Sequence, residues 1–500
     1  LFITTTCNAE WVSITEIPSV SEAKFIIEES GAVFSISAIS KGNTLLIPST
    51  FIADVLKVSL SYEPENKRLT YNIPQGKFIL FIGQQQLELP SGEKKILNES
   101  LVDILGIPFV PAELISIIGN YNIICDSRTM EIRMRRHVDG RISSLNQLRH
   151  GIHPDKIRIV FHLTEEVPFK VMQTKNPPRV IIDFQDTNAK KGLDTYFNHI
   201  AVDRVRVTTT EGKSTKAVIE LNYALPDVEV FWLRDPVRLV VDLPIIYSSQ
   251  SALTIAPGIR YITLNAGMSQ GPVTVDILEV MMDHEKVRVE TALAGTFQDF
   301  GLAPVSELVS RFKAIAGING VFHASDGTPL GLIIIDGKLR SLPIMDRTAM
   351  GITRDGEILI DNVSVDTSGN LSPNWLDQGV IHAVGGGPRL VKDGEVHITS
   401  FKEQFKADVA LGRAPRTAIG VTNDNKLLLI AVTGRKAYHS VGVTLEELAY
   451  IALELGAKDA MNLDGGGSST IVVRNFVMNT PSDGRERKVA DAILVFSQDP

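Results

Sequence analysis

The chain has few cysteines, no surplus of basic residues and no long apolar run. Its 500 residues include two cysteines, Cys7 and Cys125, which excludes a disulfide-rich scaffold. The net charge of −8 argues against a general nucleic-acid binder. No apolar run approaches the roughly 18 residues of a membrane-spanning helix. The chain contains no H-E-x-x-H and no convincing metal-ligand spacing, so we predict no metal site and no cofactor; a calcium ion held by scattered carboxylates is the alternative.

What is present is the composition of a multidomain globular protein. Apolar residues make up 44% and charged residues 22%, and 500 residues suffice for several domains with cores of their own. Residues 1–21 are predicted to be a leader, a signal remnant or a disordered start. The first nine (LFITTTCNA) end in a small residue, Ala9, as signal peptides do at their cleavage point. An arbitrary chain end is the alternative.

Residues 22–136 contain an internal repeat, in which Ile47-Pro48 matches Val110-Pro111. Each copy predicts an extended segment ending in proline, then a short amphipathic helix, then a hairpin with a polar turn. The region resembles the copper amine oxidase-like N-terminal domain of bacterial surface proteins. That resemblance implies a non-catalytic α+β module, without copper because histidine ligands are lacking.

A second repeat occupies residues 142–245, where residues 176–183 (NPPRVIID) mirror residues 235–242 (DPVRLVVD). Alternating polarity and proline-led turns predict an all-β sandwich. The region resembles the AMIN domain. The resemblance implies a module that targets envelope polymers such as peptidoglycan. Residues 247–256 (YSSQSALTIA) are predicted to be a linker to a third domain at residues 257–498.

The third region is organised around residues 462–470 (NLDGGGSST). The pattern predicts a buried strand at 427–432, a helix opened by a capping box of Thr444 and Glu447, and a short strand at 460–463. Three consecutive glycines permit a sharp turn and let a ligand approach backbone N–H groups that can cradle an anion. An acid beside such a loop can exchange protons with a bound group or attack it. A tight turn with a solvated aspartate is the alternative.

Five ordered blocks of this region together resemble the phosphodiester glycosidase family, over about residues 264–496. The blocks are residues 319–322 (NGVF), 385–390 (GGGPRL), 413–420 (RAPRTAIG), 442–449 (GVTLEELA) and 462–470. Two departures from the family pattern matter. Val321 stands where many members have glycine, and Thr433 stands where they carry aspartate.

The resemblance implies a site for a sugar phosphodiester. Phosphate requires arginine forks or a nest of N–H groups, and cleavage at the sugar carbon requires a carboxyl group, often with a second carboxylate. Asp464 is predicted to be the acid or nucleophile, with Asn319 and Asn462 as donors to sugar hydroxyls or phosphate. The predicted substrate- and phosphate-binding residues are Arg416, Thr417, Arg413, Arg389, Gly465, Gly466, Gly467 and Ser468.

Some assignments stay open. For Arg413 an ion pair in a surface loop is the alternative. No second carboxylate is evident, although Asp326 and Asp459 are candidates. The histidines near the blocks (His323, His382 and His439) have no metal-ligand spacing.

The sequence as a whole predicts a multidomain protein: an α+β repeat module, an all-β sandwich and a sheet-dominated mixed α/β catalytic domain. We expect a bacterial glycosidase of the envelope or the extracellular space that hydrolyses sugar-1-phosphodiester linkages of the N-acetylglucosamine-1-phosphodiester kind. Its substrate is predicted in a cell-wall polymer, a glycolipid or an exopolysaccharide, with peptidoglycan or wall polysaccharide as partner. The alternative is a non-catalytic wall-polymer binding protein that retains the glycosidase fold.

Overall fold

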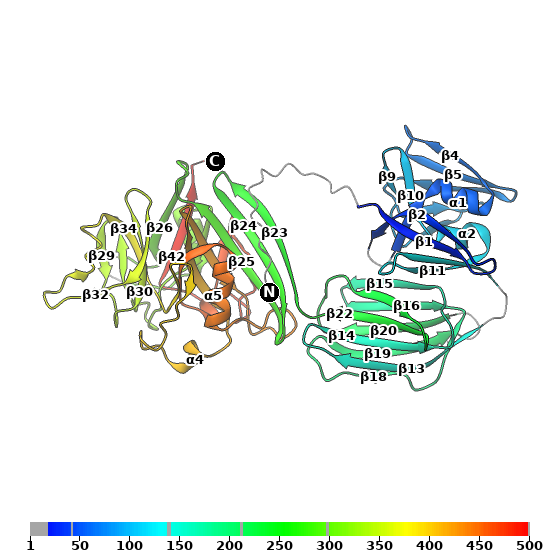
Figure 1. Ribbon diagram of the computed structural model, residues 1–500. Helices are drawn as coiled ribbons and strands as arrows, with labels where there is room; N and C mark the ends of the chain where they lie inside the picture. Colours follow the sequence, from blue (N-terminus) through cyan, green and yellow to red (C-terminus); the bar gives the residue numbers. More distant parts are fainter. Residues whose placement is uncertain (1–18, 42–43, 138–141, 211–213, 297–299, 499–500) are drawn as a thin grey trace. The chain divides into compact units, whose positions relative to one another are not determined.

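The computed structural model describes residues 19–41, 44–137, 142–210, 214–296 and 300–498. The chain divides into two units, Leu1–Pro244 and Ile245–Pro500, each with sheets and cores of its own (Figure 1). Strands dominate both units, as predicted. Most of the predicted leader lies outside the described residues. Among the described residues, the helices are too short and too polar to span a bilayer.

The first part of unit 1 contains two sheets and two short helices, α1 (Ser49–Leu56) and α2 (Leu114–Gly119). A seven-stranded sheet runs in the order β11 (Tyr121–Asp126), β12 (Glu131–Arg136), β1 (Ser21–Ile27), β2 (Ala32–Lys41), β3 (Thr44–Pro48), β10 (Ile107–Pro111), β9 (Val102–Ile104). A five-stranded sheet runs β4 (Ser59–Glu63), β5 (Arg68–Ile73), β6 (Gly76–Phe81), β7 (Gln86–Glu88), β8 (Lys94–Ile96).

The predicted repeat is confirmed at the level of its elements, because β3-α1-β4-β5 and β10-α2-β11-β12 follow the same order. Each copy begins with a strand ending in proline and each helix ends at a residue in the left-handed conformation, Lys57 and Asn120. The two hairpins join different sheets, which the repeat alone did not predict.

The second part of unit 1 consists of two five-stranded sheets. One runs β17 (Thr187–Ala189), β13 (Ser143–Ile152), β14 (Lys156–Leu163), β22 (Arg238–Pro244), β21 (Glu229–Leu233). The other runs β15 (Phe169–Lys175), β16 (Pro178–Gln185), β20 (Ser214–Leu221), β19 (Val202–Thr210), β18 (Thr195–Tyr196). Buried Phe161 of the first sheet meets buried Phe184 of the second edge to face, with ring centroids 5.4 Å apart. The two sheets therefore pack face to face, as the alternating polarity predicted.

Unit 2 is built on three larger sheets and a two-stranded one. The eight-stranded sheet runs β23 (Tyr247–Ala256), β24 (Ile259–Met268), β25 (Gly271–Met281), β38 (Lys426–Val432), β37 (Arg416–Thr422), β39 (Ala457–Asn462), β35 (Arg389–Lys392), β36 (Glu395–Val396). A five-stranded sheet runs β26 (Val287–Leu293), β42 (Asp491–Ser497), β27 (Ala316–Asn319), β40 (Ile471–Val473), β41 (Phe476–Val477). The other runs β29 (Lys338–Ser341), β28 (Ile333–Ile335), β34 (Val380–Gly385), β30 (Thr348–Thr353), β31 (Ile358–Asn362). The small sheet pairs β32 (Ser364–Val365) with β33 (Leu371–Ser372).

One core joins these sheets, and the helices cover their outer faces. The central cluster takes Ile419, Ile318 and Val384 from the eight-stranded and the two five-stranded sheets respectively. Helix α5 (Leu445–Glu454) packs across β35 and β39. The predicted capping box is confirmed, because the Thr444 hydroxyl accepts from the Glu447 backbone N–H. The remaining helices are α3 (Val305–Phe312) and the short α4 (Ala407–Ala410).

The predicted linker at residues 247–256 is wrong. These residues form β23, the edge strand of the eight-stranded sheet, paired with β24 alone. Most of its side chains are exposed, so its sequence is as polar as that of a linker.

Candidate active site

The glycine loop, residues 464–469, follows β39 and is tied to two other sequence blocks. The Asp464 N–H donates to the Gly320 carbonyl at 3.2 Å, and the Gly466 N–H donates to the Pro415 carbonyl at 2.9 Å. A 3₁₀ turn, η1 (Gly466–Ser468), closes the loop. Three blocks that are distant in sequence therefore meet at this strand end.

Each glycine of the run has its own steric reason. Gly466 has a φ of +65°, in the left-handed region that favours glycine. A Cβ on Gly465 would lie 2.9 Å from the Pro415 carbonyl oxygen, and one on Gly467 would overlap the Arg487 guanidinium. The backbone conformation of Gly466 and the backbone contact of Gly465 therefore disfavour a side chain at these two positions, and the Gly466 amide already has a partner inside the protein.

Asn319, at the end of β27, acts as a clamp on the loop. Its side-chain N–H donates to the Asp464 carbonyl at 2.7 Å. Its side-chain oxygen accepts from the Thr417 hydroxyl and from the Thr470 N–H, each at 3.0 Å. The Thr417 hydroxyl also lies 3.1 Å from that of Ser469, and Asn319 and Thr417 are completely buried. Both residues thus hold the backbone that presents Asp464.

Asn462, the last residue of β39, is also buried. Its amide donates to the carbonyls of Gly387 at 3.0 Å and Leu463 at 2.7 Å. Its side-chain oxygen is buried without a hydrogen-bond partner among the described residues. Asn462 therefore connects the glycine loop to the block at residues 385–390.

Asp464 is the first residue of the glycine loop, and 18% of its side chain is exposed. Burial raises its pKa, and the Ser468 hydroxyl, the positive charges of His323 and Arg487, and the Gly465 amide act in the opposite direction. His323 Nε2 lies 4.0 Å from Asp464 Oδ2. Its Nδ1 lies 2.9 Å from the Ala324 carbonyl, which orients the ring. An acid with a raised pKa beside an imidazole is suited to proton transfer.

The three arginines predicted to bind phosphate are occupied inside the protein. Arg416 is buried, and its guanidinium donates to the carbonyls of Val443 at 3.2 Å, Val409 at 3.0 Å and Gly412 at 2.5 Å. Burial lowers its pKa to about 10.

The other two make ion pairs. Arg413 contacts Glu447 at 2.5 Å, the arrangement that the sequence left open as the alternative. Arg389 is buried and contacts Asp459 at 2.5 Å. Asp459 is therefore paired with a structural arginine, while the other candidate second carboxylate, Asp326, accepts from the Thr328 N–H at 2.9 Å.

Two arginines that sequence reasoning missed lie on the glycine loop itself. Arg435 is exposed, and a guanidinium nitrogen of its side chain lies 3.5 Å from the position that a Cβ on Gly466 would occupy. No hydrogen bond or ion pair joins Arg435 to another described residue. Arg487 lies directly on Gly467 and pairs with Asp483 at 2.7 Å. Arg435 had a weak sequence signal, because it follows Thr433-Gly434 at a position that the family pattern marks, whereas Arg487 had none.

A buried carboxyl group, Asp491 at the start of β42, was also missed. Its Oδ1 accepts from the Val321 N–H at 2.9 Å. Burial and the nearby Asp464 raise its pKa to about 7. The sequence signal was weak, because Asp491 is a single acid at the start of a mostly apolar strand.

The two departures from the family pattern are both buried. Val321 donates its backbone N–H to Asp491, and the Thr433 hydroxyl accepts from the Thr480 N–H at 3.2 Å. Neither position contributes a charged side chain here. In the described part of the chain, no group of three or more histidine, cysteine, aspartate or glutamate residues is placed to hold a metal ion.

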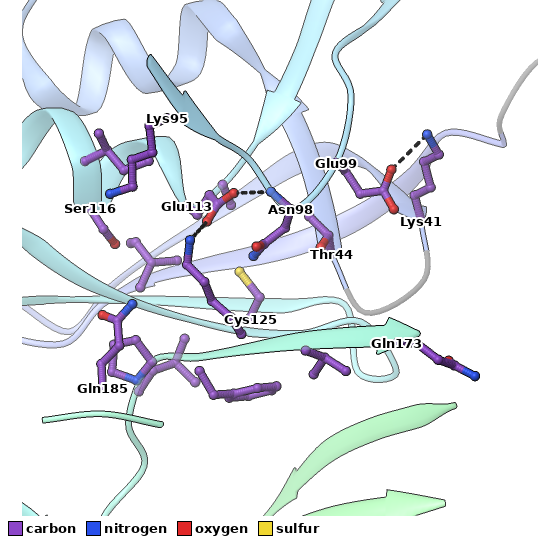
Figure 2. Close-up of a pocket in the computed structure, with 18 of the residues that line it drawn as sticks. Lys41, Thr44, Lys95, Asn98, Glu99, Glu113, Ser116, Cys125, Gln173 and Gln185 are labelled. Carbon is purple, nitrogen blue, oxygen red and sulfur yellow. Dashed lines mark hydrogen bonds and ion pairs between the residues drawn. The ribbon is translucent and has the colours of Figure 1, made fainter. Parts of the chain in front are cut away.

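A pocket elsewhere, in unit 1, contains none of the predicted site residues (Figure 2). It has a volume of about 500 Å³. Two ion pairs, Lys41 with Glu99 at 2.9 Å and Lys170 with Glu113 at 3.5 Å, occupy its charged lining. Four of its charged lining residues are therefore paired with one another, while its lining also includes Lys95 and Asp227.

Comparison with known proteins identifies two regions of the chain. Residues 312–496 match the family described as phosphodiester glycosidase, and residues 148–243 match the AMIN domain. The first match contains the glycine loop and every residue around it described above. The resemblance of the repeat at residues 22–136 to the copper amine oxidase-like domain stays a prediction.

Individual relatives agree with the first match. The chain is 30% identical over 195 residues to the SPbeta prophage-derived uncharacterized protein YomE of Bacillus subtilis, covering 38% of this chain and 29% of that protein. It is 30% identical over 183 residues to mouse N-acetylglucosamine-1-phosphodiester alpha-N-acetylglucosaminidase, covering 34% and 33% respectively. The chain thus spans about a third of the length of these relatives.

Solved structures resemble the chain more distantly. A hypothetical protein from Synechocystis covers 95% of this chain and 99% of its own, at 16% identity and a TM-score of 0.47. The catalytic domain of zebrafish N-acetylglucosamine-1-phosphodiester alpha-N-acetylglucosaminidase, auto-inhibited by its pro-peptide, covers 51% and 84%, at 24% identity and a TM-score of 0.39.

Proposed function

We propose that this chain is a hydrolase that cleaves sugar-1-phosphodiester linkages at the glycine loop of unit 2. The observation that carries the proposal is the partly buried Asp464 carboxyl, which faces His323 and Arg487 on a loop whose Gly466 also lies beside Arg435. This arrangement combines an acid and two cations at one loop, as the hydrolysis of a phosphate-linked sugar requires. The similarity to N-acetylglucosamine-1-phosphodiester glycosidases supports this substrate class.

The phosphate would lie against the glycines. Arg435 supplies a guanidinium with no partner of its own among the described residues, and Arg487 supplies one shared with Asp483. The planar fork of arginine contacts two phosphate oxygens at once. Arg416, predicted from the sequence to hold the phosphate, instead stiffens the turn before β37 through its three carbonyl contacts.

Asp464 would act at the sugar carbon. Its raised pKa lets it retain a proton for the leaving oxygen, and its position lets it alternatively attack the anomeric carbon as a carboxylate. In either role, water supplies the hydroxyl group that ends on the sugar, and the phosphate leaves as a monoester. Asn319 and Thr417 keep the Asp464 backbone in place for this step.

The accessory region would deliver the enzyme to its substrate. We propose that the AMIN domain at residues 148–243 binds peptidoglycan or another wall polymer, and that the protein works in the envelope or outside a bacterial cell. The AMIN match supports this, since such domains are typical of periplasmic or secreted bacterial proteins. Sedimentation of the full chain with purified peptidoglycan tests it, and pelleting no greater than that of an unrelated globular protein would contradict it.

The competing function is a wall-polymer binder that keeps the fold without turnover. Val321 and Thr433 favour it, because each departs from the family pattern close to the site. The clamp of Asn319 and Thr417 on the loop favours the enzyme, because such positioning serves a reacting group.

The deciding experiment is sugar release from an aryl sugar-1-phosphodiester by the full chain. We expect turnover in the parent and a loss of roughly 10²- to 10⁴-fold in kcat in Asp464→Asn, with KM little changed. Asp393→Asn is the matched control, because Asp393 is an exposed hairpin residue with a φ of +52° that asparagine also adopts. Turnover in Asp464→Asn equal to that of Asp393→Asn would remove Asp464 from the chemistry.

A further inference from the structure

Asp491 is a buried carboxyl group that the chemistry above does not use. It is completely buried at the start of β42. Its Oδ1 accepts one hydrogen bond, from the Val321 N–H, and its Oδ2 is buried without a partner among the described residues. An ionised carboxylate has about four acceptor positions to satisfy, so one left this bare is poorly stabilised as an anion.

Strand pairing places Asp491 beside Gly320, the residue to which the glycine loop is hydrogen-bonded. Asn319 pairs with Ala492 in antiparallel register, which sets Asp491 beside Gly320. A Cβ on Gly320 would overlap the Asp491 carboxyl. The carbonyl of the same glycine accepts the Asp464 N–H at 3.2 Å. Gly320, which has no side chain, therefore separates the loop that carries Asp464 from the strand that carries Asp491.

The charges around this pair are unevenly distributed. Asp464 faces His323, from the loop after β27, and Arg487, from the segment before β42. Arg435 lies beside Gly466, and Asp483 lies beside Gly467, where it pairs with Arg487. Within the described residues, no cation acts on Asp491, and the one charged group that does so is Asp464. When two such acids lie close together, the second proton leaves at a higher pH than the first.

We propose that Asp491 is the second carboxyl group of this site, a positioning residue that keeps its proton while Asp464 is ionised and thereby sets the charge of Asp464. The inference rests on the proposed function only where it concerns turnover. Burial and the proximity of Asp464 raise the Asp491 pKa to about 7, which agrees with the geometry. Above that pH both groups are charged, and the proton affinity of Asp464 rises.

The test is a carboxyl-carbon NMR titration of the full chain labelled at aspartate Cγ, for the parent, Asp491→Asn and Asp464→Asn. In the parent we expect the chemical shift of the Asp464 carboxyl carbon to show two titration steps, the second near pH 7. In Asp491→Asn the same chemical shift should show a single titration step. Asp276→Asn is the matched control: Asp276 is another buried acid of unit 2, hydrogen-bonded to Tyr261, and its loss should leave both titration steps in place.

An Asp464 signal that titrates identically in the parent and in Asp491→Asn would overturn the proposal. If Asp491→Asn does not fold, the Asp464→Asn variant decides. There the Asp491 signal should move to lower pH by at least about half a unit, because a neighbouring negative charge is gone. An unmoved signal would also overturn the proposal.

Turnover gives an independent readout. The pH profile of kcat/KM on the aryl phosphodiester should bend near pH 7 in the parent and in Asp276→Asn, and lose that bend in Asp491→Asn. Because histidine also titrates near neutrality, His323→Gln is measured alongside and should keep the bend. A parent without turnover whose Asp464 signal still shows two titration steps would refute the proposed hydrolysis and leave the carboxyl pair standing.

Discussion

Replacing Asp491 with asparagine should change how the stability of unit 2 depends on pH. The pKa of Asp491 is raised to about 7 from an ordinary value of 3.8. A folded-state pKa above the unfolded one means that the group's stabilising contribution is complete below the unfolded pKa and is lost as pH rises through the folded pKa. At about 1.4 kcal/mol per pH unit, the full difference is about 4 kcal/mol, of which about 3 kcal/mol falls between pH 4.5 and pH 8.

Asp491→Asn removes this titration but keeps the side-chain oxygen that accepts from the Val321 N–H. The variant should therefore gain about 3 kcal/mol relative to the parent between pH 4.5 and pH 8. The assay is urea unfolding followed by tryptophan fluorescence. Trp375 is buried in unit 2, so Trp11 and Trp232 are replaced by phenylalanine in both proteins to leave it as the sole reporter.

The comparison of the two proteins at each pH cancels the titration of every group that does not interact with Asp491. A difference in unfolding free energy between variant and parent that stays constant within about 0.5 kcal/mol from pH 4.5 to pH 8 would refute the reasoning. It would mean that Asp491 is ionised in the folded protein at both pH values.

Three further predictions concern the glycine loop. Arg435→Lys should raise KM roughly ten-fold with kcat held, since lysine loses the phosphate fork, whereas Arg416→Lys should lower the melting temperature with KM held. The reverse pattern in steady-state kinetics and thermal unfolding would make Arg416 the phosphate ligand. Asn319→Ala should cost roughly 2–4 kcal/mol in urea unfolding, because three buried groups lose their partner, and an unchanged midpoint would contradict the clamp. Gly467→Ala should displace Arg487 and raise KM, and an unchanged KM would show that Arg487 does not contact the substrate.

Several elements of the fold could be predicted because their signals are local. The capping box of Thr444 and Glu447 involves residues only three apart in the chain. The strand predicted at residues 427–432 is β38. By contrast, the edge strand β23 was mistaken for a linker, because a polar strand paired on one side is recognisable only by its partner.

The glycine loop and Asp464 could also be located from the sequence, since three glycines in succession after a short strand are themselves a local pattern. The surroundings of Asp464 could not. Arg416 lies within a matched block, yet burial turns its guanidinium toward three carbonyls. Arg487 reaches Gly467 from a segment that carries no recognisable motif.

The sequence by itself determined the modules, the family resemblances of residues 148–243 and 312–496, and the loop that presents the acid. The tertiary structure alone decided which charges share that loop with Asp464. Asp491 is near Gly320 only because β42 pairs with β27, a contact between segments far apart in the chain. Residue type tells which groups can ionise, but burial and neighbouring charges set whether they do, and both arise only when distant strands pack together.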